Sequence, residues 1–206
     1  MSVDTFILLA PCVLVSLALH ELAHAWVAAR LGDPTARELG RLTLNPFKHL
    51  DPLGTAMFAA TALVAGTPFG WAKPVPVNPG FFRRPKEGMA LVAAAGPAMN
   101  FMLALIALAL STHLDLHGRA AEIAYYAYLV NVVLGVFNLI PIPPLDGSRI
   151  VAVVMNDTTY RQWAALDSYG MLVVLGIFFL FREESTSALT GAYDAVTSVL
   201  QRIVGA

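Results

Sequence analysis

Long runs of apolar residues alternate with short, proline-rich connectors along the 206-residue chain. A helix needs about 20 predominantly apolar residues to cross a membrane. Runs of this order predict four membrane helices, at residues 5–31, 88–111, 121–142 and 166–181. The last run is the shortest, but it carries no charged residue after Asp167, so it is also expected to lie in the membrane.

Two further segments are apolar but weaker. Residues 53–66 are too short to cross a bilayer comfortably, and basic connectors flank them on both sides, which predicts a re-entrant or half-crossing segment. Residues 188–204 have apolar side chains at helical spacing, namely Leu189, Ala192, Val196, Val199 and Ile203. This pattern fits an interfacial helix or a final membrane segment, and the interfacial helix is favoured.

The composition supports a membrane protein. Hydrophobic residues make up 57% and charged residues 13% of the chain, and the mean hydropathy is +0.66, whereas soluble domains carry about 25% charged residues. We therefore predict an all-α, polytopic helical bundle of about four to six membrane segments. No repeat or break in composition divides it, so residues 1–206 are expected to form a single domain.

Charge and cysteine content exclude several classes of function. A net charge of −1 gives no indication of a nucleic-acid partner. The single cysteine, Cys12, excludes an intramolecular disulfide framework and a cysteine-rich metal site. The first residues lack the basic region of a secretory signal peptide, and their apolar run continues through residue 31, so this helix is expected to be retained.

The basic residues predict an orientation in the cell membrane. Of the thirteen Lys and Arg residues, four lie in connector 30–52, four in 73–87 and two in 143–165. Cytoplasmic connectors carry the excess of Lys and Arg, so these three are expected inside and the N-terminus outside. The first helix and helix 121–142 then run in the same direction across the membrane.

The first apolar run contains the sequence HELAH, with His20, Glu21 and His24. Residues four apart share one face of a helix, so the two imidazoles can bind one zinc ion, with Glu21 beside them as a general base. Ionisable residues inside a membrane helix are costly and are functional hypotheses by default. The alternative is a polar crevice in which the three side chains only form hydrogen bonds between helices.

A zinc site also needs a third protein ligand. The candidates are His49, His113, His117 and Asp146. The charge pattern puts His113 and His117 on the opposite side of the membrane, and His49 is more typical of a surface or loop-packing residue. Asp146 follows helix 121–142 at a depth similar to that of the two histidines, which favours it. Its alternative role is that of a helix cap in "LDGSR".

Three motifs in this order resemble the site-2 protease family of intramembrane zinc metalloproteases, in its compact, minimal branch. They are HELAH at 20–24, GPAMN at 96–100 and PPLDG at 143–147. The resemblance implies one Zn²⁺ per chain on His20, His24 and Asp146, with Glu21 as the catalytic base. The implied partners are the lipid bilayer and a transmembrane segment of a substrate protein, and an oligomer is compatible with the sequence.

The resemblance also implies substrate-binding roles for two asparagines. Asn100 matches a position associated with substrate near the metal, and Asn138 matches a polar position of the family pattern. The alternative for Asn138 is a hydrogen bond between helices. The expected active site lies nearer the cytoplasmic side of a multi-pass membrane protein.

The segment WAKPVPVN, residues 71–78, alternates proline and valine. Proline cannot donate to a sheet, so the segment suits an edge strand, with Val75 and Val77 presenting N–H and C=O groups on one side. An unwound substrate could add to this edge, and the family resemblance implies strands in this region. The alternative is a polyproline loop.

The sequence thus predicts a zinc metalloendopeptidase that cuts within or near transmembrane segments. One alternative is a membrane transporter or metal-ion carrier that uses the His/Asp cluster. It predicts further intramembrane acids, and the sequence offers almost none beyond Glu21 and Asp146. Another is an inactive relative that binds membrane segments, although Glu21 and the candidate ligands are all present.

Overall fold

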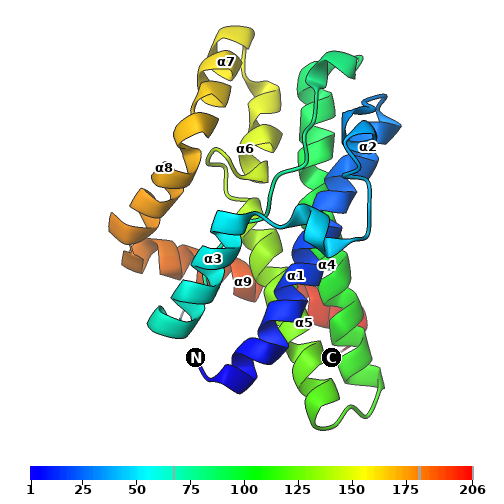
Figure 1. Ribbon diagram of the computed structural model, residues 1–206, viewed down its shortest axis with the longest axis vertical. Helices are drawn as coiled ribbons and strands as arrows, with labels where there is room; N and C mark the ends of the chain where they lie inside the picture. Colours follow the sequence, from blue (N-terminus) through cyan, green and yellow to red (C-terminus); the bar gives the residue numbers. More distant parts are fainter. Residues whose placement is uncertain (67, 181, 206) are drawn as a thin grey trace.

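A computed structural model describes residues 1–66, 68–180 and 182–205. Three of its helices are long and apolar enough to cross a membrane: α1 (Val3–Arg30), α4 (Pro85–His113) and α5 (Arg119–Asn138). They pack side by side, with α1 and α5 running in one direction and α4 in the other (Figure 1). The predicted parallel arrangement of the first helix and helix 121–142 is therefore confirmed.

The helix ends follow local chemistry. The Ser2 hydroxyl caps α1 by accepting a hydrogen bond from the Thr5 N–H, and Pro85 starts α4 at a position where no N–H is needed. Helix α5 ends at Asn138, four residues before the end of predicted segment 121–142. Residues 139–142 continue the apolar pattern, but Pro141 has no N–H to extend the helix.

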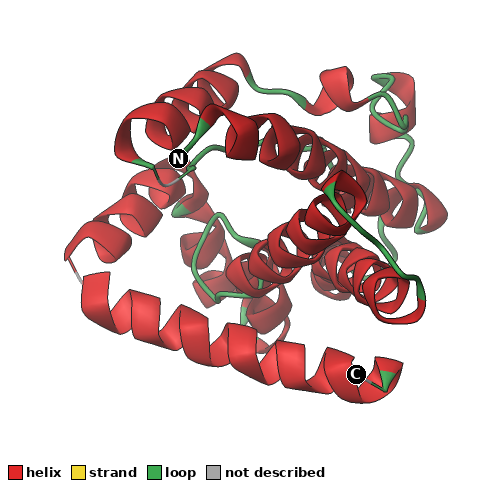
Figure 2. Ribbon diagram, turned by 90° about the horizontal axis from the view of Figure 1, so that it is seen from below, coloured by secondary structure: helices red, strands yellow, loops and turns green. Residues whose placement is uncertain are grey.

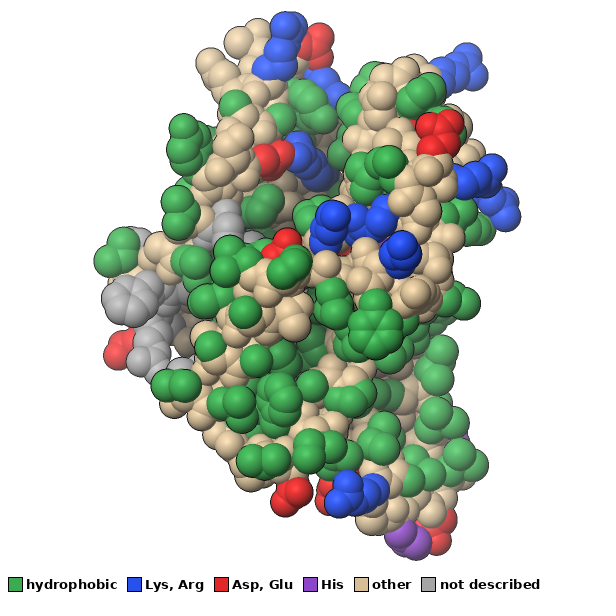
Figure 3. Space-filling view, viewed as in Figure 1, with side chains coloured by type: hydrophobic (Ala, Val, Ile, Leu, Met, Phe, Trp, Pro, Cys, Tyr) green, Lys and Arg blue, Asp and Glu red, His purple; other side chains and the backbone are tan. Residues whose placement is uncertain are grey.

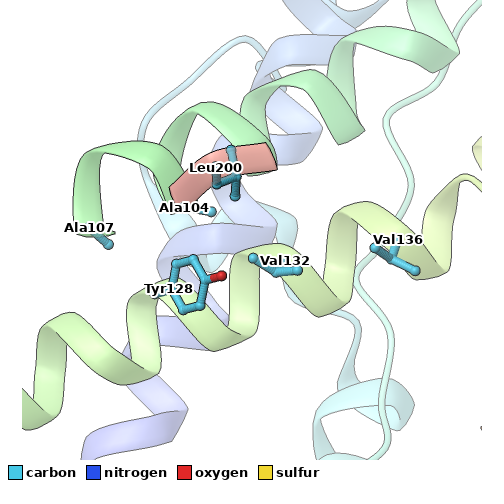
Figure 4. Close-up of a cluster of buried hydrophobic side chains, with 6 residues drawn as sticks. All are labelled: Ala104, Ala107, Tyr128, Val132, Val136 and Leu200. Carbon is cyan, nitrogen blue, oxygen red and sulfur yellow. The ribbon is translucent and has the colours of Figure 1, made fainter. Parts of the chain in front are cut away.

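A core of small and branched side chains holds α4 and α5 together. Ala104 and Ala107 of α4 pack against Tyr128, Val132 and Val136 of α5, and Leu200 closes the cluster from the C-terminal helix (Figure 4). Small residues let membrane helices approach closely, which increases the van der Waals contact between them.

The segment predicted to be re-entrant forms a short helix that turns back. Helix α3 (Pro52–Ala60) continues into the single π-turn η2 (Thr61–Ala65). The chain then returns, since Leu50 and Ala72 form an antiparallel bridge and the Lys73 N–H donates to the His49 carbonyl at 2.8 Å. Both ends of the segment thus lie together, as a re-entrant segment requires.

The predicted edge strand at Val75 and Val77 does not form. Within the described residues, the bridge at Leu50 and Ala72 is isolated, and residues 73–78 are an extended loop. The pairing ends after Lys73 because the next backbone N–H groups to be bonded, those of Val75 and Asn78, donate to the side chains of Glu21 and Asp33. The β-strand alternative is therefore wrong for these two valines, and the loop alternative is correct.

The rest of the chain surrounds this bundle. Short helices α2 (Thr35–Glu38), η1 (Pro46–His49) and η3 (Pro79–Phe81) lie in the connectors, and α6 (Asp146–Val151), η4 (Ala152–Val154) and α7 (Asp157–Ala165) follow α5. Helix α8 (Asp167–Leu180) matches predicted segment 166–181 but has 14 residues, and residue 181 lies outside the described part of the chain.

Helix α9 (Arg182–Val204) packs against α4, α5 and α8. It runs across the long helices rather than along them (Figure 2). This direction agrees better with the interfacial helix predicted for 188–204 than with a final membrane segment.

The surface divides along the direction of the long helices. Lys and Arg side chains gather toward the upper end of the visible face, and hydrophobic side chains dominate its lower half (Figure 3). All three basic connectors lie at the upper end, where α1 ends and α4 begins (Figure 1). The three basic connectors, which the sequence predicts on one side of the membrane, thus lie toward one end of the bundle, and its cytoplasmic location stays a prediction.

Candidate active site and metal centre

His20 and His24 occupy one face of α1, and Asp146 approaches them from the first turn of α6. The two Nε2 atoms lie 2.9 Å apart, and Asp146 Oδ2 lies 3.2 Å from His20 Nε2 and 3.4 Å from His24 Nε2. The histidines are 4% and 8% exposed. Asp146 makes no helix-capping hydrogen bond, so the cap alternative is wrong.

Two glycines permit this approach. A Cβ on Gly96 would lie 2.5 Å from His20 Cε1 and from His24 Nε2, so α4 can pass the histidines only with glycine there. A Cβ on Gly147 would collide with the Leu139 carbonyl, so α6 can begin against the end of α5 only with glycine there. The glycines of GPAMN and LDG therefore place α4 and Asp146 against the histidines.

The Nδ1 atoms of both imidazole rings form hydrogen bonds with neighbouring helices. His24 Nδ1 donates to the Val92 carbonyl at 2.7 Å, and His20 Nδ1 donates to Asn100 Oδ1 at 2.6 Å. Zinc-bound histidines in proteins usually donate their second N–H in this way, which fixes the ring and its tautomer. Each Nε2 is left with its lone pair directed at Asp146.

The centre fits a metal ion. The three donor atoms lie within 4.8 Å of one another. Asp146 Oδ2 is buried and has no hydrogen-bond partner within the described part of the chain, so it converges with the two Nε2 atoms as the donor atoms of a metal site do. Tetrahedral zinc with bonds of about 2.0–2.2 Å separates its ligands by roughly 3.3–3.5 Å, close to the observed spacing. Two imidazoles and a carboxylate are also a donor set of catalytic zinc sites.

Glu21 lies beside the centre in a cavity of about 420 Å³. Its Oε2 accepts a hydrogen bond from the Val75 N–H at 2.7 Å. Val75, Val77 and Asn138 all line the same cavity. The Asn138 amide donates to the Leu134 carbonyl of its own helix at 3.0 Å, and no hydrogen bond to another helix is recorded within the described part of the chain.

Three hydrogen bonds hold the extended loop 73–78 in place, one to α1 and two to the connector that follows α1. Arg41 Nη2 donates to the Lys73 carbonyl at 2.6 Å, Val75 bonds Glu21, and the Asn78 N–H donates to Asp33 Oδ2 at 2.7 Å. Burial of Asp33 favours its neutral form, but hydrogen bonds from Thr35 and Asn78 outweigh burial and hold the pKa of Asp33 below its usual value. Asp33 therefore anchors the loop as a charged acceptor.

The structure places Asn100 behind His20 rather than in the cavity. Asn100 is fully buried, and its amide nitrogen donates to Asn131 Oδ1 at 2.8 Å. The predicted contact between Asn100 and substrate thus stays a prediction, while its contact with His20 is observed. Sequence reasoning missed Asn131, although an asparagine within an apolar helix was the available signal.

The other histidines lie elsewhere. His49 is 2% exposed and its Nε2 donates to the Thr43 carbonyl at 3.0 Å, so it is the loop-packing residue expected and not a surface residue. His113 ends α4, and His117 pairs with Asp115 in the following loop. Both lie at the end of the bundle away from the basic connectors, as predicted.

A second, apolar cavity of about 500 Å³ adjoins the first. Helices α1, α3 and α5 form its walls, with Phe6, Phe58 and Tyr126 among the lining residues. The two cavities share wall residues Leu17, Gly70, Trp71, Ala72 and Leu134. The apolar cavity and the cavity at the metal centre therefore adjoin at these five residues.

Comparisons with known proteins identify zinc metalloproteases as relatives of this chain. Residues 113–181, which include Asp146, match Peptidase family M50. The chain is 44% identical to the "Putative zinc metalloprotease YwhC" of Bacillus subtilis, over 80% of this chain and 77% of that protein. It is 34% identical to the "Putative zinc metalloprotease Rip2" of Mycolicibacterium smegmatis, over 84% and 67%. A solved structure, "Site-2 Protease from Methanocaldococcus jannaschii", aligns with a TM-score of 0.49 and 20% identity, over 96% of this chain and 79% of that chain.

Proposed function

The chain belongs to peptidase family M50 and is a zinc metalloprotease of the site-2 protease type, and from this premise we propose that it hydrolyses peptide bonds within or beside transmembrane segments of other membrane proteins. The observation that carries the proposal is the placement of His20, Glu21, His24 and Asp146. All four line one cavity between helices that are long enough to span a membrane.

The residues have separable roles in this proposal. His20, His24 and Asp146 hold the zinc ion, which supplies a Lewis acid for the scissile carbonyl and lowers the pKa of water to about 7. Glu21 accepts the proton of the attacking water and returns it to the amine that leaves when the C–N bond breaks. The Val75 N–H holds the Glu21 carboxylate at the cavity wall.

The apolar cavity supports a membrane-embedded substrate. A helix hides each carbonyl in its own hydrogen bonds, so a substrate segment must unwind before its peptide bond can be attacked. The apolar cavity can receive the part that remains helical, and the adjoining polar cavity can receive the unwound part. Asn138 and the backbone of Val77 line the polar cavity and are the proposed contacts for that part.

The proposed orientation places the N-terminus outside the cell and the site nearer the cytoplasm. The basic connectors support this orientation by the positive-inside rule. Helix α6, whose first turn contains Asp146, extends from the middle of the bundle toward the same end as these connectors (Figure 1).

The test separates metal binding from cleavage. Elemental analysis of purified Glu21→Gln protein is expected to show wild-type zinc, while its cleavage activity is lost, because the change removes the base and not a ligand. His24→Ala and Asp146→Ala are expected to lose most of their zinc. Full zinc in Asp146→Ala would contradict the proposed ligand set.

The substrate can be found by comparing membrane proteomes. Cells that express the wild type should contain membrane-protein fragments that are missing from cells that express Glu21→Gln. If the two sets of fragments are identical, although both proteins are produced and carry zinc, the protease proposal fails.

A further inference from the structure

Four buried polar side chains of three apolar helices form an unbroken chain behind the metal centre. Ser16 Oγ of α1 accepts from Asn131 Nδ2 of α5 at 2.8 Å, and Asn131 Oδ1 accepts from Asn100 Nδ2 of α4 at 2.8 Å. Asn100 Oδ1 then meets His20 Nδ1 at 2.6 Å. Ser16, Asn100 and Asn131 are 3%, 0% and 2% exposed.

The direction of every hydrogen bond in this chain follows from one backbone carbonyl. Asn131 Nδ2 also lies 2.8 Å from the Ala127 carbonyl, which can only accept. The NH₂ group of Asn131 must therefore face Ala127, and its oxygen must face Asn100. Asn100 in turn must direct its NH₂ group at Asn131 and its oxygen at His20.

The last step determines the tautomer of His20. Because Asn100 presents an oxygen, His20 must carry its proton on Nδ1, and Nε2 is left with the lone pair that a metal ion requires. The partner histidine needs no such relay, since His24 Nδ1 donates directly to the Val92 carbonyl.

We propose that Asn131 is a positioning residue for the metal centre, because it holds the Asn100 amide in the orientation that keeps His20 Nε2 free for zinc. The inference rests on the proposed zinc ligands. When Asn131 loses its oxygen, the Asn100 NH₂ group loses its buried acceptor, and the amide can rotate by half a turn. Its NH₂ group then faces His20 Nδ1, and the His20 proton moves to Nε2, where it blocks the metal.

Zinc affinity is the first measurement. Purified, metal-free protein is titrated with zinc against a chromophoric chelator. Asn131→Ala is expected to bind zinc about 10–100-fold more weakly than the wild type, as for other outer partners of ligating histidines. The matched control is Tyr128→Phe. It removes another hydrogen bond of α5, the one to Thr197, and leaves the hydrogen bonds from Ser16 to His20 in place. The zinc affinity of Tyr128→Phe should stay at the wild-type value.

A second change distinguishes positioning from packing. Asp at position 100 has no NH₂ group, so it presents an oxygen to His20 in either orientation. The double variant Asn131→Ala with Asn100→Asp is therefore expected to bind zinc more tightly than Asn131→Ala alone. If Asn131 only packs the helices, Asn100→Asp should raise zinc affinity no more in the Asn131→Ala background than in the wild type, and an equal gain in both backgrounds would overturn the inference.

The tautomer can be observed without metal. Nitrogen-15 NMR of histidine-labelled, metal-free protein should show His20 protonated on Nδ1 in the wild type and in the double variant, and on Nε2 in Asn131→Ala. Ser16→Ala should keep the wild-type tautomer, because the Ala127 carbonyl still orients Asn131. An unchanged tautomer in Asn131→Ala would overturn the inference.

The experiment also distinguishes a folding defect in Asn131→Ala from a failure of the proposed zinc ligands. If Asn131→Ala does not fold, Asn131→Leu removes the oxygen that accepts from Asn100 but keeps nearly the same size, and it is expected to weaken zinc binding as Asn131→Ala should; wild-type zinc affinity in Asn131→Leu would overturn the inference. If the wild type itself binds no zinc, the proposed ligand set fails. Tight zinc binding by both the wild type and Asn131→Ala overturns the role of Asn131 alone.

Discussion

Val75 and Val77 lie two residues apart in the same extended loop, but their backbone N–H groups are used differently. The Val75 N–H is bonded to Glu21 Oε2. For the Val77 N–H, no hydrogen-bond partner is found within the described part of the chain, although the residue lines the catalytic cavity. The loop therefore offers one N–H to Glu21, the proposed base, and the other N–H is the proposed donor to a substrate carbonyl.

Proline substitutions at the two positions should have different kinetic effects. Val75→Pro removes the donor that holds Glu21, so kcat is expected to fall about tenfold or more while KM changes little. Val77→Pro removes a donor for substrate, so KM is expected to rise about fivefold, the equivalent of one net hydrogen bond, while kcat is kept. Steady-state cleavage of the substrate identified by the Glu21→Gln comparison measures both.

Controls for these substitutions are available in the same loop. Val77→Ala keeps the N–H and should cleave like the wild type, and zinc content should be normal in all three variants. If Val77→Pro has the wild-type KM, the loop does not bind substrate through this group. If Val75→Pro has the wild-type kcat, its bond to Glu21 is not needed for catalysis.

At the scale of elements, α1 and α4 cross at the metal centre. The crossing point is Gly96, where a Cβ would lie 2.5 Å from atoms of both histidines. A similar close approach occurs between α4 and α5, where a Cβ on Gly135 would lie 2.5 Å from the Phe101 ring. The two glycines permit equally tight packing, but only Gly96 faces the histidines.

This pair of glycines separates metal binding from packing. Overpacking a core costs about 1–3 kcal/mol, so Gly96→Ala and Gly135→Ala are both expected to lower the thermal unfolding midpoint. Gly96→Ala should also weaken zinc binding about tenfold or more, because ligand positions are displaced. Gly135→Ala should keep wild-type zinc affinity in the same chelator titration. Equal zinc affinity in both variants would contradict this account of the crossing.

At the scale of the whole molecule, the three long helices carry the basic connectors at one end and the 114–118 loop at the other (Figure 1). This arrangement makes the orientation testable by labelling. Cysteines are introduced, in a Cys12→Ala background, at Arg37 and Arg84, which are exposed, and near Arg149, at Val154, which is 89% exposed. In intact cells they are expected to resist an impermeant thiol reagent.

A cysteine in place of Leu114, which is 51% exposed at the opposite end near Leu116, is expected to react. After the cells are opened, all four cysteines should be labelled, which shows that protection came from the membrane. The reverse pattern in intact cells would place the catalytic site on the outer side.

The amino-acid sequence by itself determined the membrane class, the long helices and the candidate ligands. Composition and the length of an apolar run depend only on local sequence. His20 and His24 share one face because they lie four residues apart in a single helix. None of these properties depends on how the helices pack. Asp146 could be chosen over His49, His113 and His117 because the distribution of Lys and Arg determines which helices run parallel.

Tertiary structure alone decided how those residues are supported. Asn131 lies 31 residues from Asn100 and 115 from Ser16 along the chain. Its role depends on the rotation and depth of α5 relative to α1 and α4. The Val75–Glu21 bond likewise depends on where loop 73–78 settles against α1. A hydrogen bond between separate helices needs atoms placed to within a few tenths of an ångström. The hydrophobic pattern of a single helix indicates which face is buried, but not which atom of the next helix that face meets.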